Sequence, residues 1–245
     1  MTTPVFAVAA PLDSAALAER FAIDGRIQID GFLPEATAQA LRRELAASAG
    51  WRHVVNGGAK VFETARGEYD ALPAAHREAI DSAVLAAAAQ GFQFRYDVIR
   101  VPDSAAERAA RADLLATFAS FMSAPETLRW VASVTGADDL RIADAQATRY
   151  RGGDFLTRHN DKAEGKSRRL AYVLGLTPGW KAEWGGLLHF QDESGANVSR
   201  TIVPRFNALS LFTVPQPHHV SYVAPYAPEP RISITGWLRT DPPMP

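Results

Sequence analysis

The chain has 245 residues, and its 26 basic and 27 acidic side chains give a formal net charge of −1. Such a balance gives no global attraction for polyanions, so nucleic acid is not an expected partner. Cysteine is absent, which excludes disulfides and thiolate metal sites and leaves histidine and carboxylate as the ligands for any bound metal.

The N-terminal residues include a short apolar run without a basic lead-in, which is not typical of a signal peptide. No stretch approaches the roughly 18 continuous apolar residues of a membrane span. We therefore expect no membrane association and a cytoplasmic location.

The first 139 residues carry mostly helical patterns. Apolar spacing and capping residues predict helices at 14–21 and 34–47, from about 74 onward, at 105–122 and at 125–134. Alternating character predicts strands at 26–32 and 93–101. A hairpin is expected from 51–55 and 59–63 around the turn Asn56-Gly57-Gly58.

After residue 140 the pattern changes to short apolar segments separated by Gly, Pro, Asn and Asp. This pattern predicts strands at 140–150, 155–158, 169–176, 186–191, 201–203, 208–214, 220–223 and 232–238. Many short strands with frequent turns favour a barrel or sandwich. Because no flexible linker separates the halves, we expect one α+β domain over 1–245, in which a helix-rich segment at 1–139 buttresses a β-rich core at 140–240.

Two possible metal ligands lie close together in the first part of this β-rich core. His159 and Asp161 are two residues apart, so on an extended chain their side chains leave the same face. A third imidazole comes from His218 or His219, of which only one can point inward. Two imidazoles and one carboxylate form the facial set that holds non-heme Fe(II). His53, His76 and His189 are expected to be structural.

A cationic residue follows these candidates. Arg231 is followed by Ser233 on the same strand face and then by Trp237. A buried arginine suits bidentate binding of a carboxylate, and a neighbouring hydroxyl can add a hydrogen bond. The combination with the histidines and Asp161 indicates a metal site that also binds a carboxylate.

With these motifs in this order, the second half resembles the Fe(II)- and 2-oxoglutarate-dependent oxygenases, in particular the prolyl 4-hydroxylase-like branch that includes ribosomal and hypoxia-factor prolyl hydroxylases. The resemblance covers about 140–240. The segments that carry it are His159–Asp161, Trp184–Phe190, Val203–Phe212, His218–Val220 and Arg231–Trp237.

The resemblance implies a double-stranded β-helix, or jelly-roll, core and a set of site residues. His159, Asp161 and His218 would be the iron ligands, because Val220 fits the family pattern of His, any residue, then Val. Arg231 would bind the distal carboxylate of 2-oxoglutarate. The other implied co-substrate contacts are Tyr150, Ser233, Leu188, Trp237 and Tyr172, of which the last depends on its strand register.

The family chemistry couples decarboxylation of 2-oxoglutarate to oxidation of an unactivated C–H bond, with O2 as oxidant and ascorbate as reductant. Related halogenases replace the carboxylate ligand by a small residue, so Asp161 favours hydroxylation. The resemblance suggests a prolyl residue of a protein as substrate.

Several alternatives stay open. A free amino acid or small metabolite would use the same core, and a zinc hydrolase or a non-catalytic metal-binding β-barrel could carry the same three ligands. The 51–63 hairpin, residues 64–72 and loop 162–168 are candidate substrate-binding segments. The oxidised carbon, the oligomeric state and any role of His219 are not specified by the sequence.

Overall fold

The computed structural model describes residues 4–10 and 12–241, so Met1–Thr3, on which the expectation about a signal peptide partly rests, lie outside the described residues. No helix of the described residues is long and apolar enough to cross a membrane. The N-terminal half of the chain forms α1 (Ser14–Ala22), β1 (Arg26–Asp30), α2 (Glu35–Ala47), β2 (Arg52–Gly57), β3 (Lys60–Ala65), α3 (Arg66–Asp70), α4 (Ala74–Ala88), β4 (Phe94–Arg100), α5 (Ala105–Ala110), α6 (Leu114–Met122) and α7 (Pro125–Thr135).

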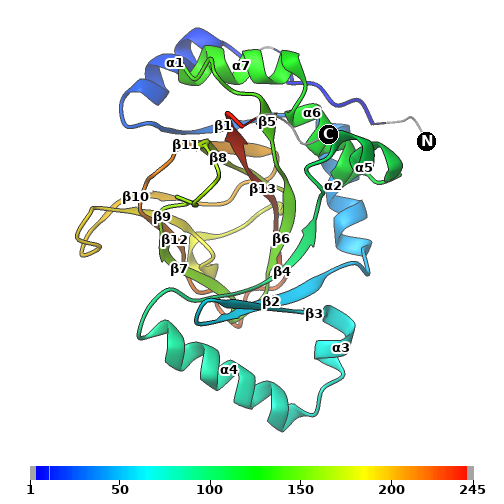
Figure 1. The fold of residues 1–245 in the computed structure, drawn as a ribbon, viewed down its shortest axis with the longest axis vertical. Coiled ribbons are helices and arrows are strands. Elements are labelled where there is room, and N and C mark those ends of the chain that lie inside the picture. Colours follow the sequence, from blue (N-terminus) through cyan, green and yellow to red (C-terminus); the bar gives the residue numbers. More distant parts are fainter. Residues whose placement is uncertain (1–3, 11, 242–245) are drawn as a thin grey trace.

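The regular elements of the remainder are almost all strands. Its elements are β5 (Ile142–Ala143), β6 (Gln146–Tyr150), β7 (Phe155–His159), β8 (Arg168–Gly175), a 3-10 turn η1 (Ala182–Trp184), β9 (Leu188–Gln191), β10 (Val198–Ile202), β11 (Ala208–Thr213), β12 (His218–Val220) and β13 (Arg231–Arg239). In the described part of the chain the strands form one sheet, whose main path runs β1-β11-β8-β13-β6-β4-β7-β12-β9-β10. Beside this path, β2 pairs with β3 and β4, and β5 pairs with β13. The sheet curls into a nearly closed barrel (Figure 1). The predicted α+β class is confirmed.

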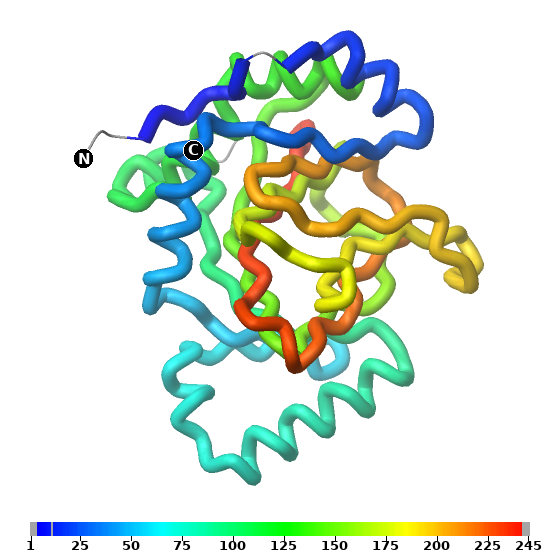
Figure 2. Tube along the Cα trace, turned by 180° about the vertical axis from the view of Figure 1, so that it is seen from behind, coloured from blue at the N-terminus to red at the C-terminus, as the bar shows by residue number. Residues whose placement is uncertain are grey.

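The N-terminal half supplies four strands, β1 to β4, to this sheet. β4 lies between β6 and β7, and β1 pairs antiparallel with β11, with Ile27 opposite Leu211. The helices α1 and α7 lie together at one end of the molecule, and α4 lies at the opposite end in both views (Figures 1 and 2). The barrel is therefore built from both halves of the chain.

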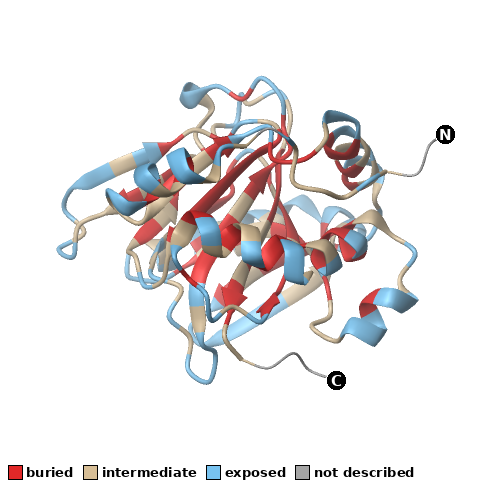
Figure 3. Ribbon diagram, turned by 90° about the horizontal axis from the view of Figure 1, so that it is seen from above, coloured by how far each residue is buried: buried red, intermediate tan, exposed pale blue. Residues whose placement is uncertain are grey.

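The main hydrophobic core joins the helices to the sheet. Leu41 of α2, Phe118 of α6 and Val131 of α7 share one buried cluster with Leu174 of β8 and Ile234 of β13. Burial is concentrated on the strands and on the inward sides of these helices (Figure 3). Burying each such side chain stabilises the fold by roughly 1.5–3 kcal/mol relative to leaving it exposed. This shared core therefore holds the helices against the barrel.

Two helical details differ from the sequence prediction, and the strand expected at 220–223 lies instead at 218–220. The expected helix at 105–122 is broken into α5 and α6, because Asp113 caps the second helix by accepting a hydrogen bond from the amide of Ala116 at 2.7 Å. Arg108 of α5 is buried and donates to backbone carbonyls, including that of Ala143 at 3.0 Å. The short helix α3 was not predicted, since it contains Gly67 and lacks a side-chain cap.

A buried carboxylate precedes β7 and gives a pH prediction. Burial raises the pKa of Asp154 to about 7, against the opposing hydrogen bond from the amide of Arg151 and the charge of Arg95. Because an unfolded aspartate titrates near roughly 3.9, the folded protein holds a proton here that the unfolded chain releases. This contribution to stability is complete below about pH 4 and is lost as the pH rises through about 7.

We expect the free energy of unfolding of the wild type to fall between about pH 5 and about pH 8 relative to that of Asp154→Asn, which is neutral throughout. Urea unfolding of both proteins at several pH values measures the difference. Parallel pH dependence in the two proteins would contradict the prediction.

Candidate active site

A cavity of about 890 Å³ opens into the barrel. Two strands line it with every second residue, as the two-residue repeat of a strand requires. On β6 these are Gln146, Thr148 and Tyr150, and on β13 they are Arg231, Ser233, Thr235 and Trp237. The two rows lie side by side, because Tyr150 pairs with Arg231 and Thr148 with Ser233 in the β6–β13 ladder.

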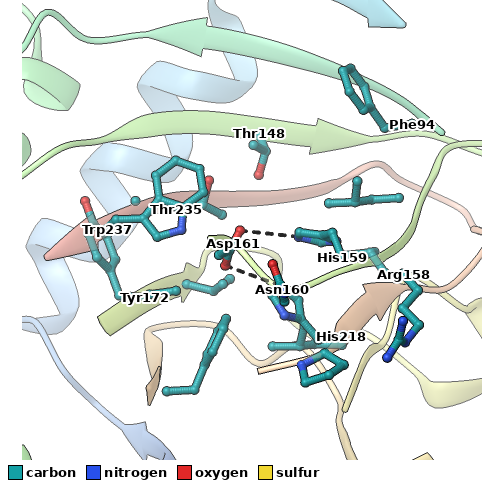
Figure 4. Close-up of a pocket in the computed structure, with 18 of the residues that line it drawn as sticks. Phe94, Thr148, Arg158, His159, Asn160, Asp161, Tyr172, His218, Thr235 and Trp237 are labelled. Atoms are coloured by element: carbon teal, nitrogen blue, oxygen red, sulfur yellow. Dashed lines mark ion pairs between the residues drawn. The ribbon is translucent and has the colours of Figure 1, made fainter. Parts of the chain in front are cut away.

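His159, Asp161 and His218 meet in this cavity. One candidate ligand atom from each lies within 4.8 Å of the others. The Asp161 carboxylate is 3.4 Å from Nε2 of His159 and 3.5 Å from Nε2 of His218 (Figure 4). The strands β7 and β12 bring the two imidazoles together, since His218 pairs directly with His159.

Both imidazoles are oriented by the backbone. Nδ1 of His159 lies 3.0 Å from the carbonyl of Thr157, and Nδ1 of His218 lies 2.8 Å from the carbonyl of Gln216. A carbonyl oxygen only accepts hydrogen bonds, so each Nδ1 carries the proton and each Nε2 is left with a lone pair toward Asp161. A histidine that binds metal through one ring nitrogen usually donates such a hydrogen bond from the other ring nitrogen, which fixes the orientation of the ring.

The charge states also suit a cation. Burial, with the neighbouring His159, lowers the pKa of His218 to about 4, so this imidazole is neutral at pH 7. Burial acts to raise the pKa of Asp161, but its contacts with His159 and His218 outweigh burial and lower the pKa. One carboxylate and two imidazoles fit the donor set of Fe(II).

Arg231 is the unusual charge in the cavity. Its side chain is 3% exposed, and Nε and Nη1 have no hydrogen-bond partner among the described residues. The ring of Tyr150 lies 5.2 Å from the guanidinium carbon, and no carboxylate pairs with Arg231 in the described part of the chain. A buried charge without a partner is costly, so this guanidinium is arranged to receive an anion.

The other predicted co-substrate contacts also line the cavity. Tyr150, Tyr172, Leu188, Ser233 and Trp237 all contribute to its wall. Ser233 lies 3.0 Å from the hydroxyl of Thr148, with both side chains buried. The hydroxyl of Tyr172 donates to the carbonyl of Asp144 at 2.7 Å, so it is already engaged. Gly236 permits this close approach, because a Cβ there would meet the same carbonyl and hydroxyl.

Two histidines predicted to lie apart from the metal ligands do not reach the cavity. His189 and His219 stack on each other with ring centroids 4.8 Å apart, and neither lines the cavity. The 51–63 hairpin and residues 64–72 contribute no lining residue either, whereas Lys162 and Arg168 of loop 162–168 do. The loop is thus the candidate segment that borders the site.

An aromatic wall that the sequence analysis missed runs into the cavity. Phe92, Phe94 and Tyr96 form a row, with successive ring centroids 5.7 and 5.4 Å apart, and Tyr96 stacks on Tyr150 at 5.2 Å. Phe92 is 52% exposed, and its ring centroid lies 5.9 Å from that of His159. The two-residue alternation of aromatic residues at 92, 94 and 96 is the signal that could have indicated this wall.

The cavity thus combines a donor set that suits non-heme Fe(II) with a buried guanidinium. Residues 145–239, which include β6 through β13, match the family described as the 2OG-Fe(II) oxygenase superfamily. The matched segment contains His159, Asp161, His218 and Arg231.

Curated relatives are similar over less than half of this chain. Prolyl 3-hydroxylase OGFOD1 from Mus musculus is 32% identical over 115 residues, which are 44% of this chain and 21% of the relative. The Xenopus laevis protein of the same name is 32% identical over 116 residues, or 45% of this chain and 22% of the relative. The match thus spans only about a fifth of the length of these relatives.

Solved structures are similar over nearly the whole chain. A Pseudomonas putida prolyl-4-hydroxylase superposes with a TM-score of 0.58 at 22% identity, covering 94% of this chain and 100% of that one. A Trichoplax adhaerens prolyl hydroxylase, solved with a hypoxia inducible factor oxygen degradation domain peptide, gives 0.59 at 17% identity, covering 93% and 89%. These similarities confirm the predicted jelly-roll core.

Proposed function

We propose that this protein is an Fe(II)- and 2-oxoglutarate-dependent dioxygenase that hydroxylates a prolyl residue of a protein. The observation that carries the proposal is the buried, unpaired Arg231 in the same cavity as His159, Asp161 and His218. A metal site alone would not need this guanidinium. A carboxylate-bearing co-substrate bound beside the metal accounts for both.

Each residue then has a role. His159, Asp161 and His218 hold Fe(II), which when bound supplies the activation of O2 for decarboxylation of 2-oxoglutarate and hydroxylation of a C–H bond. Arg231 binds the distal carboxylate of the co-substrate, with Tyr150 and Ser233 beside it. Leu188, Trp237 and Tyr172 form apolar walls that exclude water, and the engaged hydroxyl of Tyr172 limits it to this role.

A protein substrate is supported by the relatives and by the cavity mouth. Similar proteins are named as prolyl hydroxylases, and one was solved with a peptide. The exposed Phe92 and the partly buried Phe94 offer an apolar surface beside His159 on which a prolyl ring can pack. The shared core of helices and strands supports our further proposal that residues 1–245 form one domain.

The test is 2-oxoglutarate turnover, measured as succinate formation with Fe(II) and ascorbate, with a mixture of proline-containing peptides added. We expect succinate and prolyl residues heavier by one oxygen with the wild type, and neither with His159→Ala, because one of three ligands is lost. Chelation of the metal should abolish both signals, and Fe(II) should restore them.

His189→Ala is the matched control, since His189 lies outside the cavity and should retain turnover. Anaerobic addition of Fe(II) and 2-oxoglutarate should also produce a weak visible absorption band in the wild type and in this control. Stoichiometric zinc without 2-oxoglutarate binding would refute the proposal, and oxygen incorporated only into free amino acids would refute the protein substrate.

A further inference from the structure

Asp161 has a left-handed backbone conformation, which is uncommon for residues other than glycine, although aspartate adopts it more readily than most. Its φ is 62°, in the left-handed region, which costs an L-residue roughly 1–2 kcal/mol. Such conformations persist only where the surroundings enforce them. Asp161 follows the end of β7 and opens the loop that leads to β8. The direction of its carboxylate therefore depends on whatever holds this backbone.

Arg168 makes the contact that can hold it. Its Nη1 donates a hydrogen bond to the backbone carbonyl of Asp161 at 2.8 Å. Arg168 is the first residue of β8, and the loop between the two is further closed by a bridge between Ala163 and Lys166. The guanidinium thus ties the end of one strand to the start of the next across the loop.

Arg168 is itself held by the barrel wall. Its guanidinium carbon lies 3.5 Å from the centroid of the Trp237 ring, which is a close cation–π contact. The backbone amide of Trp237 donates to Asp144 at 2.7 Å, and Arg239 donates to the same carboxylate at 3.2 Å. Trp237 and Asp161 lie side by side in the cavity (Figure 4). A continuous series of contacts therefore connects Asp144 through Trp237 and Arg168 to the backbone of Asp161.

We propose that Arg168 is a positioning residue that holds Asp161 in its left-handed conformation and so aims its carboxylate at Nε2 of His159 and His218. The inference rests on the proposed function, because it takes these three residues as metal ligands. The site is then shaped before the metal arrives, which raises metal affinity by reducing the ordering that binding requires. Lysine would supply a donor but not the flat stacking surface of the guanidinium.

The test uses Co(II) as a spectroscopic probe with the full chain. We compare Arg168→Met and Arg168→Lys with the control Arg169→Met, whose side chain is 54% exposed and pairs only with Asp139. The dissociation constant for Co(II) is measured by calorimetry, its ligand geometry by visible absorption, and the stability of the metal-free proteins by thermal unfolding.

We expect Arg168→Met to bind Co(II) about 10–100-fold more weakly than the wild type, the range found when a residue supporting a metal ligand is lost. Its Co(II) spectrum should shift, because Asp161 no longer holds its position. Arg168→Lys should fall between the two, and Arg169→Met should match the wild type. A purely structural role would lower the unfolding temperature and leave the affinity and spectrum of the folded protein unchanged.

The outcomes separate this inference from the proposed function. If the wild type binds Co(II) and folded Arg168→Met and Arg168→Lys bind it equally well with the same spectrum, Arg168 does not position Asp161. Equal weakening in Arg169→Met would also overturn the inference, because it would indicate a general effect of charge. If the wild type binds neither Co(II) nor 2-oxoglutarate, the proposed function itself fails.

Discussion

Replacing Arg231 by methionine is expected to weaken 2-oxoglutarate binding by about 100–1000-fold, which corresponds to roughly 3–4 kcal/mol. The guanidinium is buried, has free donors on Nε and Nη1, and has no carboxylate partner among the described residues. Methionine retains much of the apolar volume but can neither donate hydrogen bonds nor balance a negative charge. The dissociation constant is measured by anaerobic calorimetry with a divalent metal present.

Although Arg231→Met should weaken 2-oxoglutarate binding, it should raise the stability of the protein without co-substrate. Without a co-substrate, the buried charge of Arg231 lacks a partner, and replacement of such a group by an apolar side chain stabilises the fold. We therefore expect Arg231→Met to unfold at a higher temperature than the wild type in the absence of 2-oxoglutarate, and only the wild type to gain stability when it is added.

Arg231→Lys is the matched variant, since it keeps the charge and loses the planar pair of donors. Its affinity for 2-oxoglutarate should lie between those of the other two proteins. Unchanged 2-oxoglutarate affinity in Arg231→Met would contradict the assigned role of this residue.

Replacing Asp97 by asparagine is expected to lower the free energy of unfolding by about 3–5 kcal/mol, the usual cost of breaking a buried ion pair. The Asp97 side chain is 0% exposed. It accepts from Arg149 of β6 at 2.8 Å and from Arg66 of α3 at 3.2 Å, and lies 3.2 Å from Nδ1 of His53 on β2. The neutral amide would leave the guanidinium groups without their counter-charge.

The pH dependence of this contribution follows from the direction of the pKa shift. Burial acts to raise the pKa of Asp97, but the hydrogen bond with His53 and the charges of Arg66 and Arg149 outweigh it, so the pKa is lowered. Stability from this carboxylate is therefore present above the unfolded pKa of roughly 3.9 and is lost as the pH falls through the lower folded value.

Urea unfolding at neutral pH and at acid pH measures both effects. Asp139→Asn is the control, because Asp139 is 48% exposed and pairs only with Arg169, so its loss should cost at most about 1 kcal/mol. Equal losses for the two variants would show that the buried network does not stabilise the fold as argued.

Most of the site residues that the sequence could predict follow from the alternation of side chains along a strand. The two-residue repeat of β13 places Arg231, Ser233 and Trp237 on one face, and the structure brings all three to the cavity wall. The choice between His218 and His219 could not be made from the residues alone, because adjacent strand residues face opposite sides and both sides carry an imidazole. The pairing of His218 with His159 resolves which side chain faces the cavity.

Features that depend on contacts between distant segments were beyond sequence reasoning. His53 was treated as structural, yet its place beside Asp97 follows only from the pairing of β2 with β4. The left-handed backbone of Asp161 and its contact with Arg168 depend on how one loop closes, which no periodic pattern records. The break between α5 and α6 did have a local signal in Asp113, an N-cap residue inside the expected helix.

The pairing of β1 with β11 has a consequence for how the chain acquires its structure. Ile27 and Leu211 are partners although about 180 residues separate them, and such distant contacts slow folding. During synthesis on the ribosome, β1 is made long before its partner β11 leaves the exit tunnel. Until then β1 lacks its partner, and the side chains of Ile27 and Ile29, which are buried in the folded protein, are open to chaperones or to aggregation.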